Sequence, residues 1–218
     1  MKSDEALTIL LQNVRDINDL DKPENKWIMH SLYVGQAAGK IANRLNLNED
    51  YARAIGYLHD IGRIINHANH TIEGYKYLDN LGYPEIGRYC LTHSFVNNII
   101  PNTIGSGPSN DSYEFISNYL NSIELNIYDN IVQLCDLFCM ETGYTTFEKR
   151  ILDITKRKGV YENSYNHFES IMALKEKFEQ MMGMKIYDLF PQIKKEDIDN
   201  AEKEREELFE LFKKGKNK

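Results

Sequence analysis

The sequence has few of the residues that build disulfide or thiolate-metal frameworks. It contains three cysteines, Cys90, Cys135 and Cys139, and no two of them have Cys-x-x-Cys spacing. An odd number at these spacings does not indicate a disulfide framework or a thiolate zinc site. Cys135 and Cys139 stand four apart in an apolar stretch, which is typical of core packing on one helix face. We therefore predict a protein of the reducing cytoplasm.

Positive charge and long apolar runs are also scarce. Lys and Arg number 26 against 33 Asp and Glu, which gives a net charge of −7. Because non-specific nucleic-acid binding depends on neutralising phosphates, this balance argues against it, although not against a small phosphorylated substrate. No apolar run approaches the ~18 residues that span a membrane, so no membrane association is predicted. The first residues place acids before the apolar run and have no cleavage-site pattern, unlike a signal peptide.

Helical periodicity runs through nearly the whole chain, and no convincing alternating strand is found. Asn48 is a suitable N-cap, Gly82 a suitable residue after a helix end, and Pro84 suits a first turn. The loop at 96–111 is the longest irregular segment. The predicted helices cover 4–18, 25–46, 48–62, 70–81, a stretch from Pro84 through His93, 112–123, 128–141, 145–158, 163–182 and 194–214. The fold class is therefore predicted to be all-α.

The length of 218 residues fits one large domain or one domain with appendages. We predict an N-terminal helix in 1–24, a domain core in 25–145, and a C-terminal helical extension in 146–218 packed on that core. The last helix is densely charged with a thin apolar stripe. Such a helix packs on the bundle or on a second copy of the chain in a homodimer.

The stretch GYLHDIGRIINHANH, residues 56–70, holds half of the six histidines in the chain together with an aspartate. Adjacent residues on a helix diverge by about 100°. His59 and Asp60 can therefore share a target only at a helix end or between helices. We place them at the C-terminal end of the helix that begins at Asn48.

Two more ligand-type residues fall in apolar helical settings. His30 shares a helix face with Trp27 and Val34, and Asp136 stands mid-helix between Leu134 and Leu137. A carboxylate in a core-facing helix is unfavourable unless it is paired or bound to metal. Imidazole and carboxylate together suit borderline and hard divalent metals. The sequence thus predicts a metal site between helices.

The order His30, His59-Asp60, Asp136 resembles the defining motif of the HD-domain phosphohydrolase superfamily, and LHDIGR resembles the HDIG form of its central dyad. The resemblance covers roughly residues 25–145. It implies an all-helical bundle in which these four residues hold one divalent metal. Members mostly cleave phosphomonoester or phosphodiester bonds, often in nucleotides. The implied function is a metal-dependent phosphohydrolase acting on a nucleotide or a related small phosphate ester.

Two further stretches, HTIEGYKYL at 70–78 and YCLTHS at 89–94, resemble helices that supply a second metal in binuclear members. The resemblance implies that His70 and His93 are ligands and that Asp60 bridges both ions. Binuclear members often have another histidine near His93, which this chain lacks. One or two ions of Fe, Mn, Ni, Co, Mg or Zn are therefore expected. His67 is the reserve ligand if His70 faces away.

Asp60 and Arg63 are the predicted catalytic residues. A divalent ion lowers the pKa of a bound water toward ~7, and the resemblance makes Asp60 central to holding that ion. Arg63 follows the dyad and can grip a phosphate bidentately, or it can interact with the helix C-terminus. Lys149 and Arg150 are weaker candidates for the phosphate.

Two other functions remain open from the sequence. Some binuclear HD proteins use iron as oxygenases, and other HD modules are non-catalytic metal-binding sensors. The complete ligand set argues against the sensor. His167 is predicted to lie at the surface, since it stands in a polar helix start.

Overall fold

A computed structural model describes residues 1–218 apart from 13, 15, 97–109 and 216–218. Over these residues the regular secondary structure is almost entirely helical, which confirms the all-α prediction. The predicted loop at 96–111 falls mostly outside the described residues. The elements in chain order are α1 (Ser3–Leu11), η1 (Ile17–Asp21), η2 (Pro23–Asn25), α2 (Lys26–Arg44), α3 (Glu49–Leu58), η3 (Ile61–Ile64), α4 (His70–Asn80), α5 (Pro84–Thr92), α6 (Asn110–Asn121), α7 (Ile127–Asp136), β1 (Cys139–Met140), β2 (Gly143–Tyr144), α8 (Phe147–Lys158), α9 (Ser164–Met182), α10 (Ile186–Leu189) and α11 (Lys195–Gly215).

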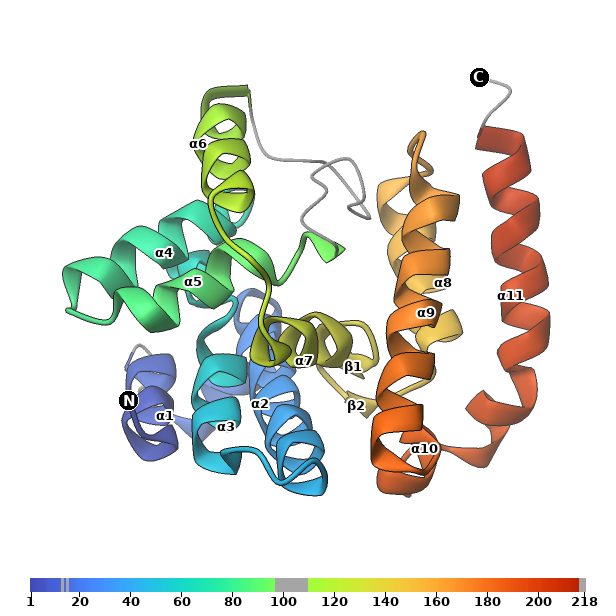
Figure 1. The fold of residues 1–218 in the computed structure, drawn as a ribbon, viewed down its shortest axis with the longest axis horizontal. Helices are drawn as coiled ribbons and strands as arrows, with labels where there is room; N and C mark the ends of the chain where they lie inside the picture. Colours follow the sequence, from blue (N-terminus) through green and yellow to red (C-terminus); the bar gives the residue numbers. More distant parts are fainter. Residues whose placement is uncertain (13, 15, 97–109, 216–218) are drawn as a thin grey trace.

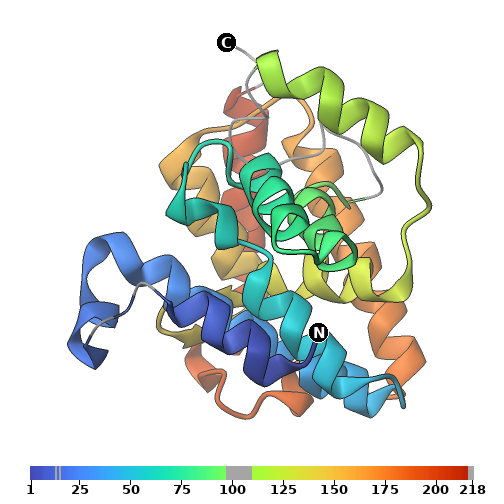
Figure 2. The same cartoon turned by 90° about the vertical axis from the view of Figure 1, so that its left-hand side faces the viewer.

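The helices form a bundle around α2 and α7 (Figure 1). Helix α3 packs between α1 and α2, and α4 packs along α5 above them. Helices α8, α9 and α11 make up the opposite side of the molecule. The view turned by 90° keeps α1 beside α3 and α4 beside α5 (Figure 2). Of the described helices, none has the length and apolar character needed to cross a membrane.

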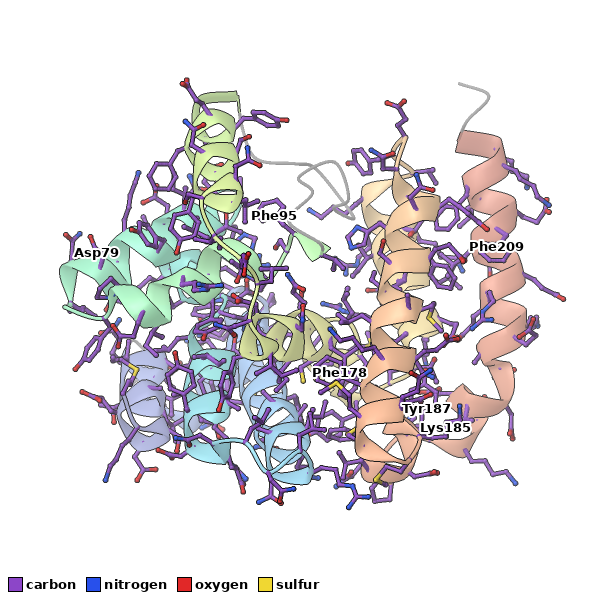
Figure 3. The ribbon with its side chains drawn as sticks, viewed as in Figure 1. Asp79, Phe95, Phe178, Lys185, Tyr187 and Phe209 are labelled. Atoms are coloured by element: carbon purple, nitrogen blue, oxygen red, sulfur yellow. The ribbon has the colours of Figure 1, made fainter. Side chains whose placement is uncertain are left out.

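One hydrophobic core joins α2 and α7 to the C-terminal helices. It includes Val34, Phe138, Phe178 and Phe212, all of them buried. Figure 3 shows Phe178 on the side of α9 that faces α7. A second cluster joins α1, α3 and α5. The C-terminal extension thus packs on the rest of the chain, while the domain boundaries at 24/25 and 145/146 stay predictions.

Several helices end earlier than predicted, and the first helix and the one predicted for 128–141 differ most. The first ends at Leu11 instead of residue 18, because the Asp16 side chain caps a new 3-10 helix by accepting from the Asn18 amide. The helix predicted for 128–141 ends at Asp136 and leads into an antiparallel hairpin in which Cys139 pairs with Tyr144. The sequence analysis found no convincing strand, and the structure adds this one two-stranded hairpin among the described residues. Strands of two residues are too short to show alternation in the sequence.

The prediction that His167 lies at the surface was also wrong, since this residue is buried. His167 shares a face of α9 with Ser164, Phe168 and Ile171, which are buried too. These residues follow the three- and four-residue spacing of side chains on one side of a helix. Because α11 packs on α8 and α9, the polar start of α9 lies beneath another helix.

Candidate metal centre

The end of α3 positions the central dyad. Helix α3 stops at Leu58, four residues earlier than predicted, and His59 and Asp60 follow before η3 begins. Both side chains are buried. The His59 Nδ1 donates to the Gly56 carbonyl at 2.7 Å, since a carbonyl can only accept. In the neutral ring His59 Nε2 therefore carries no proton, and its lone pair is available to a metal.

The first group of ligand-type side chains gathers around His59. His30, His59 and Asp60 have ligand atoms within 4.8 Å of one another. Asp136 Oδ1 lies 2.9 Å from His30 Nε2 and 3.9 Å from His59 Nε2. Asp136 is the last residue of α7 and does not stand mid-helix as predicted, because the chain turns there into the hairpin. The structure thus brings the four predicted first-metal ligands together.

A second group, Asp60, His70 and His93, also has its ligand atoms within 4.8 Å of one another. The Nε2 atoms of His70 and His93 lie 3.1 Å and 3.6 Å from Asp60 Oδ1. Their Nδ1 atoms donate to the carbonyls of His67 and Cys90. His67 is itself exposed, so His70 and not the reserve ligand His67 faces the group.

Asp60 is common to both groups. Its Oδ1 faces His70 and His93, while its Oδ2 lies 3.8 Å from His59 Nε2. A carboxylate with one oxygen toward each group has the arrangement of a bridging ligand.

The donor atoms fit a cation. His59 Nε2, His70 Nε2 and Asp60 Oδ1 are buried and make no hydrogen bond within the described part of the chain. Since His70 Nδ1 carries the proton, its Nε2 and Asp60 Oδ1 are two acceptors facing each other at 3.1 Å. Such a contact is unfavourable without a positive charge between the atoms. The imidazole and carboxylate set suits a divalent transition metal.

The Ser94 side chain contacts one histidine of the second group. Its hydroxyl donates to His93 Nε2 at 2.9 Å. An ion bound at His93 would replace this hydrogen bond, just as an ion held by His30 Nε2 and Asp136 would replace the 2.9 Å hydrogen bond between them.

Burial and charge fix the protonation of these groups. Burial raises the pKa of the Asp60 carboxyl, but Arg63 and the three nearby histidines outweigh it and hold the pKa well below its usual range. Burial also lowers the pKa of His70 to about 4 and that of His93 to about 3. Both imidazoles are thus neutral near pH 7, which is the form that binds metal.

The metal-free protein should lose stability in acid. Unfolded histidine has a pKa of about 6.5, so below this pH the unfolded chain binds more protons than the folded chain. The contribution of neutral His70 to the free energy of unfolding is fully present above pH 6.5. It is lost as the pH falls toward the folded pKa of about 4. This loss is on the order of 3 kcal/mol, since one pKa unit corresponds to about 1.4 kcal/mol.

Denaturant unfolding in chelator between pH 7.5 and 4.5 measures this loss. His70→Gln should reduce the pH dependence, leaving the part that comes from His93, and His67→Gln, which alters an exposed side chain, should leave it unchanged. A free energy of unfolding that stays constant over this range would contradict the prediction.

Arg63 contacts the dyad directly. Its Nε donates to Asp60 Oδ2 at 2.6 Å, and its side chain is 28% exposed. The contact with a carboxylate differs from both sequence-based interpretations, which were a phosphate grip and a helix C-terminus. It leaves the terminal guanidinium N–H groups available to a further acceptor.

The two weaker phosphate candidates separate in the structure. Lys149 pairs with Asp197 at 2.6 Å, away from the histidines. Arg150 has a buried Nε without a hydrogen-bond partner among the described residues. Burial lowers the pKa of His30, and the Arg150 charge lowers it further. Of the two, Arg150 is therefore the one whose charge reaches the centre.

Two glycines that the sequence analysis did not single out hold the centre together. A Cβ on Gly62 would stand 2.0 Å from the His70 carbonyl oxygen and 2.4 Å from the Gly74 nitrogen. Only glycine permits this approach of η3 to α4. Gly62 is the glycine of HDIG and Gly74 belongs to the stretch that begins at His70, so both positions could be noticed in the sequence. The sequence alone does not show that the two glycines touch.

Comparison with known proteins adds one finding. A family model described as HD domain matches residues 27–141, which is more than half of the chain. This span includes all six ligand-type residues of the two groups and ends within the hairpin after α7. No solved structure matches the chain.

Proposed function

The chain belongs to the HD domain family, and we propose that it is a metal-dependent phosphohydrolase that cleaves a phosphomonoester or phosphodiester bond. The proposed substrate is a nucleotide or a related small phosphorylated molecule. The observation that carries the proposal is the position of Asp60, whose two oxygens face two separate groups of histidines. Family membership makes a hydrolase the expected class of enzyme.

The chain's own residues have distinct roles in this proposal. His30, His59, Asp60 and Asp136 would hold one divalent ion, and Asp60, His70 and His93 would hold a second. Such ions supply an activated water near neutral pH and offset the charge of a phosphate. The Nδ1–carbonyl bonds of His59, His70 and His93 fix the rings so that Nε2 faces the centre.

Arg63 would orient both the carboxylate and the substrate. Its Nε holds Asp60 Oδ2, and the remaining N–H groups can donate to a phosphate oxygen. Because the side chain is partly exposed, a substrate arriving from solvent can reach it. Arg63 would thus contact both Asp60, the proposed bridging ligand, and the phosphate of the substrate.

Replacing Arg63 tests this role. A hydrogen bond to a charged group contributes about 1.5–3 kcal/mol, so Arg63→Ala should lower kcat/KM by about 10- to 100-fold. A grip that is equal in ground and transition states would raise KM, and one that tightens in the transition state would lower kcat. Turnover of a panel of phosphomonoesters and phosphodiesters with Mn²⁺, Fe²⁺, Co²⁺ and Ni²⁺ measures the effect.

The matched control is Arg157→Ala. Arg157 is an exposed arginine that pairs with Asp153 at 2.7 Å on α8. It should leave turnover unchanged. If no phosphoester in the panel is turned over, the hydrolase proposal fails. If turnover is seen and Arg63→Ala equals the wild type, only the role of Arg63 fails.

A binuclear iron oxygenase is the second candidate, because a carboxylate shared by two histidine groups also suits a pair of iron ions. A mixed-valence electron paramagnetic resonance signal from the iron-loaded protein, without phosphoester turnover, would favour it. Metal binding with neither property would favour a sensor domain.

A further inference from the structure

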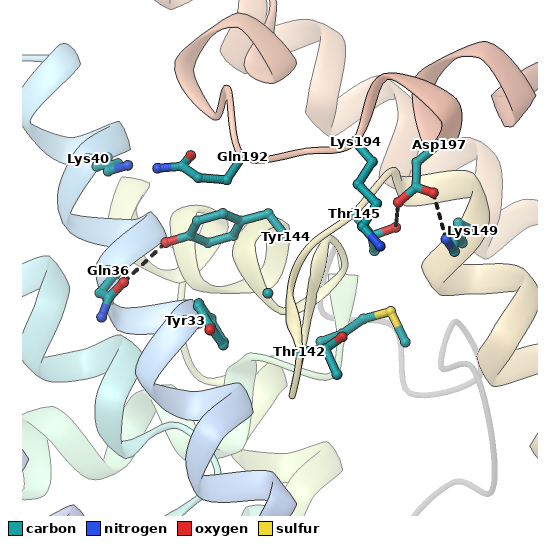
Figure 4. A pocket seen from close by; sticks show the side chains of 12 residues that line it. Tyr33, Gln36, Lys40, Thr142, Tyr144, Thr145, Lys149, Gln192, Lys194 and Asp197 are labelled. Carbon is teal, nitrogen blue, oxygen red and sulfur yellow. Dashed lines mark hydrogen bonds and ion pairs between the residues drawn. The ribbon is translucent and has the colours of Figure 1, made fainter.

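A cavity of about 350 Å³, whose lining contains none of the ligand-type residues of the metal centre, lies between α2, the β1–β2 hairpin, the start of α8 and the segment leading into α11 (Figure 4). Its volume is near the lower end for small-molecule pockets. The side chains that matter below come from α2 (Gln36, Lys40), the hairpin (Tyr144), α8 (Lys149) and the C-terminal segment (Gln192, Lys194).

The charge of this cavity is positive. Three lysines, Lys40, Lys149 and Lys194, line it together with one carboxylate, Asp197. Asp197 is already satisfied within the protein: one oxygen binds Lys149 Nζ at 2.6 Å, and the other accepts from Thr145 Oγ1 at 3.2 Å. The Lys149–Asp197 pair is therefore neutral as a unit.

The other two lysines keep their charge uncompensated. Neither Lys40 nor Lys194 forms an ion pair with a carboxylate in the part of the chain that the structure describes. Lys40 Nζ lies 5.8 Å from the Tyr144 ring centroid and 5.3 Å from that of Phe190. Such cation–π contacts hold an ammonium at a surface without neutralising it. In a chain with net charge −7, two uncompensated ammonium groups in one cavity favour an anionic ligand.

Neutral polar groups add hydrogen-bonding capacity beside the lysines. Figure 4 shows Lys40 and Gln192 extending toward one another past the Tyr144 ring. The Tyr144 hydroxyl donates to Gln36 Oε1 at 3.4 Å, which leaves the Gln36 amide N–H groups available. Both glutamines are exposed, so a ligand from solvent can reach them.

The cavity is distinct from the metal centre. Lys40 follows His30 by ten residues on α2, an axial rise of about 15 Å. Lys194 comes from the C-terminal segment, outside the family match at 27–141. Lys40 and Lys194 lie on opposite sides of Tyr144 (Figure 4), so a ligand that spans the cavity and reaches both would connect α2 to the C-terminal segment.

We propose that this cavity binds a small phosphate monoester through Lys40 and Lys194, separately from the metal centre. A phosphate monoester carries about −1.5 to −2 charges at neutral pH, which suits a cavity with two uncompensated ammonium groups in its lining. Lysine binds phosphate as a point charge. The cavity volume fits a molecule no larger than a mononucleotide. Because the ligand binds the folded state across two parts of the chain, it stabilises their contact.

Calorimetric titration of the full chain with AMP in the presence of EDTA tests the proposal without the metal. We expect one AMP per chain, a rise in melting temperature with AMP, and no binding of adenosine, which lacks the phosphate. The double variant Lys40→Gln/Lys194→Gln should weaken AMP binding at least tenfold. Circular dichroism and melting without ligand verify that this variant folds.

Two controls locate the site. Asp60→Asn should bind AMP like the wild type, and so should Lys195→Gln, which changes the neighbouring exposed lysine outside the cavity lining. Equal loss in Asp60→Asn would place the anion at the metal centre and overturn the proposal. No AMP binding by the wild type, or equal binding of adenosine, would overturn it as well. Since no turnover is measured, failure here leaves the phosphohydrolase proposal standing.

Discussion

The Asp60→Asn variant should lose both proposed metal ions and all metal-dependent turnover. The substitution removes the one carboxylate shared by the two ligand groups. An amide carries no negative charge, and its nitrogen cannot serve as a second oxygen ligand. We expect turnover to fall by more than about 10³-fold, which corresponds to about 4 kcal/mol in the activation free energy.

Elemental analysis of protein purified without chelator, together with phosphoester turnover, measures both losses. His70→Ala should remove only the second ion, because His70 belongs to one group while Asp60 belongs to both. Asp79→Asn is the matched control, since Asp79 is exposed near the end of α4 that lies away from the centre (Figure 3). Unchanged metal content in Asp60→Asn would contradict the ligand assignment.

Local signals in the sequence singled out four of the six ligand-type residues, His30, His59, Asp60 and Asp136. An adjacent His59 and Asp60 require a helix end, and the structure ends α3 at Leu58. A carboxylate at position 136 among apolar residues needed a partner, and His30 lies 2.9 Å from it. Residue type and setting pointed to these four residues, while their role as one ligand set and the choice of His70 and His93 came from the resemblance to the HD-domain superfamily.

Contacts that depend on packing between helices could not be predicted in the same way. The Arg63 contact with Asp60 Oδ2 depends on how η3 turns after the dyad. The hairpin after Asp136 has strands of only two residues, and His167 becomes buried because other helices cover α9. In each case tertiary packing decided the outcome, and a local pattern does not contain that information.

The approach of Gly62 to Gly74 is such a packing feature, and it supports the second large prediction. Gly62→Ala would place a methyl carbon 2.0 Å from the His70 carbonyl oxygen and 2.4 Å from the Gly74 nitrogen. Both neighbours are backbone atoms, so no rotation of a side chain relieves the overlap. Helix α4 must therefore move away from η3.

This displacement should affect stability and metal binding together. Overpacking a close contact costs about 3 kcal/mol when the backbone has to shift, so the melting temperature should fall on the order of 10 °C. His70 begins α4 and would move away from Asp60. Affinity for the second ion should fall more than affinity for the first, because His30 and His59 do not belong to α4.

Gly87→Ala is the matched comparison, because it adds the same methyl group to the helix that packs along α4. Its nearest neighbour there would be the Tyr75 carbonyl oxygen at 3.0 Å, a much smaller overlap. Alanine is favoured over glycine within a helix by about 1 kcal/mol, which offsets that contact. Thermal melting and metal titration of both variants compare them directly. Equal stability of Gly62→Ala and Gly87→Ala would show that η3 and α4 tolerate separation, and the close glycine contact would then have no role in joining Asp60 to His70.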